Sequence, residues 1–325
     1  MRARQILTIF FTMVLFALFS LSPSAGEAQS LKVTLLGTGT PRPVIDRFGP
    51  STLIQTDKGN FLFDCGRGVS QRLWQLNIPL REVTHLFLTH LHSDHVVGIP
   101  DFWLTSWLPT NYGRRKVPLR IWGPQGTKEM MSYLEKAFQV DMRIRIEDEK
   151  LPPEGFATLV EDIAEGVVYD KDGMKITAFN VDHGPAITAI SPTFGYRIDY
   201  AGRSVVLSGD TRFNENLIRY SQGVDLLVHE VGAAKEELLR KSEAARRIIG
   251  HHTTPEEAGK IFDRVKPKLA VYTHIVLVAD PPVGAPTTEE IIASTKKTYS
   301  GPVEIGEDLM VIEVGDVVKV RRHSR

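Results

Sequence analysis

The stretch Thr89-His90-Leu91-His92-Ser93-Asp94-His95 decides how this chain folds and what it holds. It follows the apolar run 86–88, which predicts a buried strand. At a strand end, side chains two positions apart point the same way, so His90 and His92 share one face. If the chain then turns, Asp94 and His95 face a second point nearby. Imidazole and carboxylate both bind zinc, so this spacing predicts two metals rather than one. A polar loop after a buried strand is the alternative, and it is weaker because such a cluster is rare.

Composition limits the class of protein. The chain has 325 residues, of which 42% are hydrophobic and 24% charged, with a formal net charge of zero. These values are typical of a soluble globular protein with one large domain or two ordinary ones. They exclude the general basic surface of many nucleic-acid-binding proteins. Cys65 is the only cysteine, so no intrachain disulfide forms, and a buried, inert thiol is the favoured interpretation.

The first residues predict a secretory leader. Two arginines precede the apolar run 6–21, and Gly26-Glu27-Ala28 fits a cleavage site between small residues. We therefore predict a signal peptide over 1–28 and a catalytic domain over 29–325. The mature protein is expected to be periplasmic or secreted, with no membrane attachment after cleavage. An uncleaved N-terminal anchor is the alternative.

Short β-rich runs alternate with helical segments along the rest of the chain, which predicts an α/β fold with layers of sheet and helix around one core. Thr254 followed by Pro255 and two glutamates predicts a helix start, and 127–138 and 235–248 have helical spacing. Strands are predicted over 31–36, 51–56, 60–63, 85–88, 119–122, 175–181, 193–199, 204–207, 225–229 and 269–273.

Three further residues stand where predicted strands end. His183 follows the strand 175–181, Asp210 follows 204–207, and His274 follows 269–273. Functional groups gather at the carboxyl ends of strands in α/β folds. Each residue alone is weak evidence, but two metals need a bridging carboxylate and additional nitrogen donors. His85, His229, His251 and His323 are predicted to be structural or exposed.

At this point the chain resembles the metallo-β-lactamase superfamily, and within it the ribonuclease Z and arylsulfatase-like branch. The resemblance implies a four-layered αββα sandwich with a dinuclear site at one edge. The motifs that carry it, in order, are 36–41 (LGTGTP), 63–66 (FDCG), 90–95, His183 with 195–197 (GYR), 208–211 (SGDT), 229–230 (HE), 252–254 (HTT) and 273–274 (TH).

The resemblance also implies a site with two Zn²⁺ per chain. A water or hydroxide would bridge the two ions and act as the nucleophile, because zinc lowers the pKa of bound water towards neutrality. Catalytic roles are implied for Asp94, Glu230 and His252, the last two as proton donors to the leaving oxygen. A histidine that only orients a metal ligand is the alternative for His252. The implied ligands are His90, His92 and His183 for one ion, Asp94, His95 and His274 for the other, and Asp210 for both.

For the substrate, the sequence favours a small-molecule anionic ester, a sulfate or a phosphate, and no nucleic acid. The predicted leader would remove the enzyme from tRNA. The segment 147–165 is acidic, and 275–280 departs from the Ser-x-Arg-Tyr continuation typical of ribonuclease Z. The alternatives are a ribonuclease Z-like 3′ tRNA endonuclease, a lactonase or β-lactamase-type hydrolase, and a non-catalytic zinc-binding protein. A homodimer is left open.

Two neighbouring segments bear on the same question. Phe102, Trp103 and Trp107 have the chemistry to stack an aryl leaving group, but their helical spacing favours core packing. The basic residues 114–116 have the charge to attract a sulfate or phosphate, and a solvated loop is the default interpretation.

Overall fold

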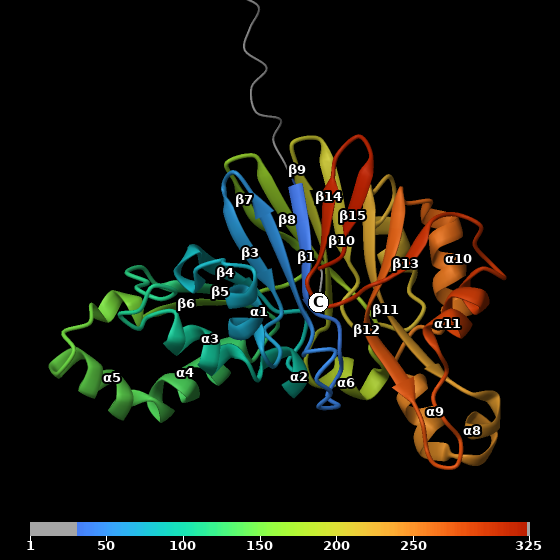
Figure 1. Cartoon of the computed structure of the whole chain (residues 1–325), viewed down its shortest axis with the longest axis horizontal. Coiled ribbons are helices and arrows are strands. Elements are labelled where there is room, and N and C mark those ends of the chain that lie inside the picture. Colours follow the sequence, from blue (N-terminus) through green and yellow to red (C-terminus); the bar gives the residue numbers. More distant parts are fainter. Residues whose placement is uncertain (1–30, 324–325) are drawn as a thin grey trace, which may run out of the picture.

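Two β-sheets face each other and carry helices on their outer sides in the computed structural model, which describes residues 31–323 (Figure 1). The predicted signal peptide, residues 1–28, lies outside this range. Among the helices of residues 31–323, none has the length and apolar character needed to cross a membrane.

The first sheet joins an antiparallel half to a parallel half. Strands β3 to β6 run parallel to one another, whereas β15, β14, β1, β2 and β3 are paired antiparallel. In spatial order its strands are β15 (Val318–Arg321), β14 (Met310–Val314), β1 (Leu31–Gly37), β2 (Ser51–Thr56), β3 (Gly59–Phe63), β4 (Val83–Phe87), β5 (Leu119–Gly123) and β6 (Thr158–Asp162).

The second sheet has the same mixed character. Strands β10 to β13 are parallel neighbours, and β7 to β10 are paired antiparallel. In spatial order its strands are β13 (Val303–Ile305), β12 (Leu269–Val278), β11 (Leu226–Ala234), β10 (Arg203–Leu207), β9 (Phe194–Tyr200), β8 (Met174–Asn180) and β7 (Gly166–Lys171).

Alternating side chains divide the interior into three apolar cores. In β3, Phe61 and Phe63 belong to the core between the sheets, whereas Leu62 packs under helices on the outer face. This is the two-residue period of a strand that is covered on both sides. The second sheet has its own outer core. Three cores separate four layers, which confirms the predicted αββα sandwich.

The outer layers contain most of the helices. The helices α1 (Val69–Gln75), α3 (Ile99–Thr105) and α4 (Thr127–Ala137) contribute buried residues to the core over the first sheet. The helices α7 (Glu215–Tyr220), α10 (Pro255–Val265) and α11 (Thr288–Thr295) do so over the second sheet. The remaining helices are α2 (Ser93–Val96), α5 (Gln139–Glu147), α6 (Pro185–Ile190), α8 (Glu236–Lys241), α9 (Glu243–Ile249), and the 3₁₀ turns η1 (Leu80–Glu82) and η2 (Pro153–Gly155).

One prediction about helices is wrong in detail. The segment 235–248, predicted as a single helix, forms α8 and α9, which are separated at Ser242. Ser242 has extended backbone angles, and its side chain accepts a hydrogen bond from Ala245 N, which starts a second helix. Both helices lie beyond the second sheet, at the far ends of β11 and β12 (Figure 1).

Candidate metal centre

The opening motif lies where β4 ends and α2 begins. His92 is the N-cap residue of α2, and Asp94 and His95 stand in its only turn. The two-residue spacing of the strand end and the turn of the helix therefore bring all four side chains to one place. His90, Asp94 and His95 are buried, with 1%, 7% and 1% of their surface exposed.

Asp64 holds this motif in place. It follows β3, the parallel neighbour of β4, and accepts hydrogen bonds from Thr89 N at 2.8 Å and Thr89 Oγ1 at 2.9 Å. Its Oδ2 also lies 2.7 Å from His95 Nδ1. A proton on Nδ1 leaves His95 Nε2 free to bind a cation. The sequence analysis assigned no role to Asp64. Its position at the end of the strand beside the motif could have indicated that its carboxylate orients a ligand.

The second sheet supplies the missing partners. His183 follows β8, Asp210 follows β10 and His274 lies within β12. The strands β8, β10 and β12 run in one direction, so their carboxyl ends meet at the same edge of the sheet. All seven predicted ligands are thereby brought together. The groups with donor atoms within 4.8 Å of one another include His90–His92–His183, His90–His95–Asp210 and Asp94–His95–His274.

Asp210 lies between the two halves of this cluster. Its Oδ2 is 3.4 Å from His274 Nε2, 3.7 Å from His183 Nε2 and 3.9 Å from His90 Nε2. Its Oδ1 is 3.5 Å from His95 Nε2. This is the position that a carboxylate shared by two cations requires.

The pKa shifts of three ligands suit a metal; the pKa of His95 differs, because the Asp210 and Asp64 carboxylates outweigh the lowering effect of burial and raise it well above its usual value. Burial lowers the pKa of His90 well below its usual value, and burial also lowers the pKa of His183. Although burial acts to raise the pKa of Asp210, the surrounding histidines hold it well below the usual range. Neutral imidazoles and an ionised carboxylate are the forms that bind metals.

Unpaired donor atoms point to the same conclusion. His95 Nε2 and Asp210 Oδ1 are buried without a hydrogen-bond partner among the described residues. His92 Nδ1 lies 3.0 Å from His90 Nε2 and 3.2 Å from His183 Nε2. Nitrogen lone pairs that meet at this range repel one another unless a proton or a cation lies between them. The donor set therefore fits a metal site, since buried polar atoms without partners are costly.

Glu230 and His252 form a second buried pair beside the cluster. His252 Nδ1 lies 3.1 Å from Glu230 Oε2, and Thr253 N donates to Glu230 Oε1 at 2.7 Å. Burial acts to lower the pKa of His252, but the Glu230 carboxylate outweighs it and raises the pKa to about 9. The ring of His252 lies 5.3 Å from that of His183 and 5.6 Å from that of His274, centroid to centroid. His252 therefore carries a proton next to the cluster.

The segment 249–254 links this pair to the ligands. His251 O accepts a hydrogen bond from His183 Nδ1 at 2.9 Å, which leaves His183 Nε2 facing the cluster. Thr254 is the N-cap of α10, as predicted, and with Glu257 it also forms a capping box. Gly232 is needed here, because a Cβ at this position would lie 2.6 Å from His252 Cβ.

A cleft of about 600 Å³ opens onto the cluster. Part of its wall is apolar and comes from the end of β12, and another part comes from the loop after β1. The lining residues are Thr40, Pro41, Arg42, His92, Asp94, His183, Asp210, Ile248, His251, His252, His274, Val276, Leu277, Val278, Ala279 and Pro281.

Several other candidates lie elsewhere. The His85 ring stacks on Trp122 at 5.7 Å, His229 is fully buried, and Cys65 is a buried free thiol, all as predicted. Phe102, Trp103 and Trp107 are also buried, which confirms core packing over an aryl pocket.

The prediction of a solvated loop at 114–116 is wrong for Arg115. This residue is 1% exposed, and its guanidinium donates to Trp103 O, Gly155 O and the Ser106 hydroxyl. These acceptors replace water around the charge, so Arg115 is a structural residue.

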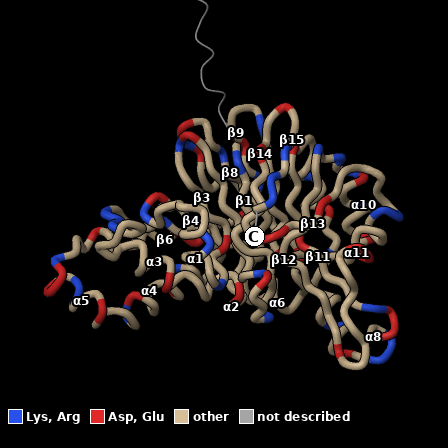
Figure 2. Tube along the Cα trace, viewed as in Figure 1, with Lys and Arg blue, Asp and Glu red and all other residues tan. Residues whose placement is uncertain are grey.

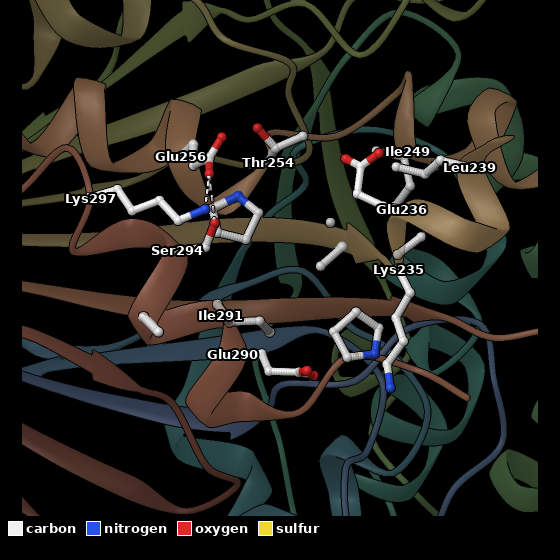
Figure 3. Close-up of a pocket in the computed structure, with 16 residues that line it drawn as sticks. Lys235, Glu236, Leu239, Ile249, Thr254, Glu256, Glu290, Ile291, Ser294 and Lys297 are labelled. Atoms are coloured by element: carbon white, nitrogen blue, oxygen red, sulfur yellow. Dashed lines mark hydrogen bonds and ion pairs between the residues drawn. The ribbon is translucent and has the colours of Figure 1, made fainter. Parts of the chain in front are cut away.

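A second pocket lies on the other side of the segment 249–254 (Figure 3). It has a volume of about 530 Å³ and lies among β11, α8, α9, α10 and α11. Glu256 and Lys297 form an ion pair of 2.6 Å at one edge of it (Figure 3). Its lining contains neither histidine nor cysteine, and none of its residues belongs to the metal-ligand groups found among the described residues.

Known proteins match this chain along most of its length. Residues 59–275 match the family described as "Beta-lactamase superfamily domain". The "Ribonuclease Z" of Mycobacterium bovis (strain BCG / Pasteur 1173P2) is 37% identical over 289 residues, which cover 87% of this chain and 98% of that protein.

Solved structures share the fold. The metallo-beta-lactamase fold protein YhfI from Bacillus subtilis has a TM-score of 0.66 at 20% identity, covering 87% of this chain and 99% of that one. The short form of human tRNase Z has a TM-score of 0.63 at 22% identity, with the same coverage of 87% and 99%.

These relatives correct one prediction. A small-molecule ester substrate without a nucleic-acid partner was expected, but the sequence relatives are named ribonucleases. The acidic segment 147–165 misled the prediction. It lies at the edge of the first sheet, around α5 and β6, and none of its residues lines the cleft (Figure 1). Along α5, acidic and basic residues are also interspersed (Figure 2).

Proposed function

This chain belongs to the beta-lactamase superfamily and, within it, to the ribonuclease Z branch, and from that premise we propose that it cuts phosphodiester bonds in RNA. It is a metal-dependent hydrolase that acts on ester bonds. The finer assignment is a ribonuclease Z-like endonuclease that cleaves at the 3′ side of a tRNA. The observation that carries the hydrolytic chemistry is Asp210, which lies among histidines of both sheets and lines one cleft. The relatives named "Ribonuclease Z" support RNA as the substrate.

The donor set suits two divalent ions, and nitrogen with carboxylate donors favours zinc. When bound, the ions supply positive charge that neutralises a phosphate and acidifies water. His90, His92 and His183 would hold one ion. Asp94, His95 and His274 would hold the other. Asp210 would contact both.

The chain's own residues then handle protons and orientation. Glu230 fixes His252 through Nδ1, so His252 Nε2 is the atom that delivers a proton into the cleft. That proton neutralises the leaving oxygen, which would otherwise depart as an alkoxide. Asp64 and the His251 carbonyl hold His95 and His183 in orientations that leave their Nε2 atoms facing the cluster.

A substrate panel tests this proposal. Zinc-loaded protein is incubated with a 5′-labelled tRNA precursor that carries a 3′ trailer, with bis(p-nitrophenyl) phosphate, and with an aryl sulfate and a lactone. The expected result is one cleavage at the 3′ end of the tRNA, lost in Asp210→Asn. Hydrolysis of the sulfate or lactone with intact RNA would overturn the proposal.

The location of the protein is a separate proposal. The predicted signal peptide over 1–28 supports export to the periplasm or the medium. Fractionation of cells that express the whole chain, with N-terminal sequencing of the product, tests it. A full-length product in the cytoplasm would contradict export and leave the proposed chemistry in place.

A further inference from the structure

Arg42 is the only lysine or arginine in the lining of the metal cleft. It stands in the loop between β1 and β2, and its side chain is exposed. No acidic side chain of residues 31–323 pairs with it. By contrast, Arg72 forms an ion pair with Asp308 at 2.7 Å, and Arg212 forms one with Asp182. Arg42 therefore keeps an unpaired cation at the mouth of the cleft.

The wall next to this loop is apolar. Val276, Leu277 and Val278 continue β12 past His274, and their side chains are half-buried rather than fully covered. Backbone pairing with the end of β11 fixes this wall, since Val276 is opposite Gly232 and Val278 is opposite Ala234. Partly exposed aliphatic side chains on a rigid strand favour an apolar, flat group in the cleft.

The Arg42 loop and the apolar wall both line the cleft and are joined to each other by a backbone hydrogen bond. Ile275 N donates to Thr38 O at 3.1 Å, which attaches the start of the Arg42 loop to the base of the wall. One ligand can thus contact both. A nucleotide has the matching chemistry, since it joins an anionic phosphate to an apolar, flat base.

We propose that Arg42 and the wall Val276–Val278 form a nucleotide subsite beside the metal cluster. Arg42 holds a backbone phosphate that flanks the scissile bond, and the wall packs against the adjacent base. Arg42 is a positioning residue, because it acts on a phosphate other than the one that is cut. The inference rests on the proposed ribonuclease function and names how the RNA chain is held.

The test compares a long substrate with a short one. RNA has flanking phosphates, whereas bis(p-nitrophenyl) phosphate has only the scissile one. In Arg42→Ala, kcat/KM for RNA should fall about tenfold to a hundredfold, mainly through KM, as expected for one charge-assisted phosphate contact. This loss should exceed the loss on bis(p-nitrophenyl) phosphate by at least about tenfold. Arg42→Lys should recover part of the lost kcat/KM for RNA, because lysine keeps the positive charge but lacks the planar guanidinium that binds a phosphate through two N–H groups.

Salt dependence and a matched control sharpen the comparison. Arg42→Ala should lower the slope of log KM for RNA against log salt by about one, because one phosphate contact is lost. Arg120→Ala removes an equally exposed arginine that lies on β5 and does not line the cleft. Its kinetics should match those of the unmodified protein.

The wall is tested with an RNA that lacks one base. Leu277→Ser should raise KM on intact RNA and have no effect on RNA that is abasic next to the cut. Equal effects on both substrates would overturn the role of the wall. Equal losses on RNA and on the small diester would overturn the role of Arg42. If the unmodified protein cleaves the small diester but no RNA, the proposed function fails, and the subsite fails with it.

Discussion

Asp210 approaches histidine nitrogens of both sheets at 3.4–3.9 Å. Asp210→Asn keeps the shape of the side chain but removes the charge that the two proposed cations would share. We expect at least a hundredfold loss in kcat/KM, on the scale of losing metal-ion catalysis. Metal content, measured by elemental analysis of the same sample, should fall in parallel. Full activity with a full metal load would contradict the bridging role.

Glu230 sets the pH at which His252 gives up its proton. The carboxylate raises the pKa of His252 to about 9, so kcat/KM should fall as pH rises through the pKa of this general acid. In Glu230→Gln the charge is gone, and the falling limb should move to lower pH. Bound cations lower this pKa in both proteins, which leaves the direction of the shift unchanged.

The pH–rate profile on bis(p-nitrophenyl) phosphate measures this shift. Glu256→Gln, which changes a carboxylate in the second pocket, is the matched control and should leave the profile in place. A falling limb that stays where it is in Glu230→Gln would show that His252 is not the acid.

His85 makes the folding stability depend on pH, although it takes no part in the proposed reaction. Burial lowers its pKa from 6.5 to about 4. Between these values the unfolded chain binds a proton that the folded chain does not, so stability falls as pH drops through this window. His85→Phe keeps a ring beside Phe61 and Trp122. Its loss in Tm between pH 7 and pH 5 should be smaller than that of the unmodified protein. Parallel losses would contradict this account.

Among the elements, β11 and β12 determine the geometry of the site. Their register shifts between Glu230 and Val231, next to His274, whose φ is 41°. Residues other than glycine rarely adopt this left-handed backbone conformation. Backbone strain of this kind is concentrated at functional sites. The shift lets Glu230 and His274 both contribute to the site while β12 continues beyond it as the wall of the cleft.

Gly232→Ala tests how closely β11 must approach His252. The new Cβ would lie 2.6 Å from His252 Cβ, so the segment 250–254 has to move. We expect kcat/KM to fall about a hundredfold, as for a displacement of roughly 1 Å in a catalytic group. Gly284→Ala meets nothing within 4 Å and is the control. Equal activity of the two variants would contradict the tight fit.

Sequence patterns predicted the elements that carry local signals. The strand 51–56 and the capped start of α10 match the structure. The ends of β11 and β12 were predicted wrongly. The predicted strands stopped at His229 and Thr273, next to the polar site residues. In the structure the strands continue to Ala234 and Val278, since pairing between them outweighs the polar interruption.

For the whole molecule, the site was more predictable than the partner. The seven proposed ligands were found from strand ends and family motifs, and the fold brings all of them together. The nucleic-acid partner was missed because the predicted leader, the acidic segment 147–165 and the unusual residues 275–280 were all weighed against RNA. Only the fold shows that the segment 147–165 lies at the sheet edge, away from the cleft.

Metal should stabilise the whole fold, because its ligands come from both sheets. A ligand that binds only the folded state adds about 2.7 kcal/mol at a hundredfold excess over its Kd. A chelator should therefore lower Tm by a few degrees, and added zinc should restore it. In Asp210→Asn the chelator should have little effect. A Tm that the chelator leaves unchanged in the unmodified protein would mean that the cluster holds no metal.

The proposed metal ligands are far apart in the sequence, so the ribosome makes them at different times. His90 is made early in the chain, whereas His274 belongs to β12, which only β13, β14 and β15 follow among the strands of residues 31–323. A nascent chain still lacking β12 has four histidines of the cluster but no His274, and no wall Val276–Val278. Such a chain therefore has neither the complete ligand set nor the nucleotide subsite. The proposed nuclease therefore could not cut RNA near the ribosome before β12 has been made.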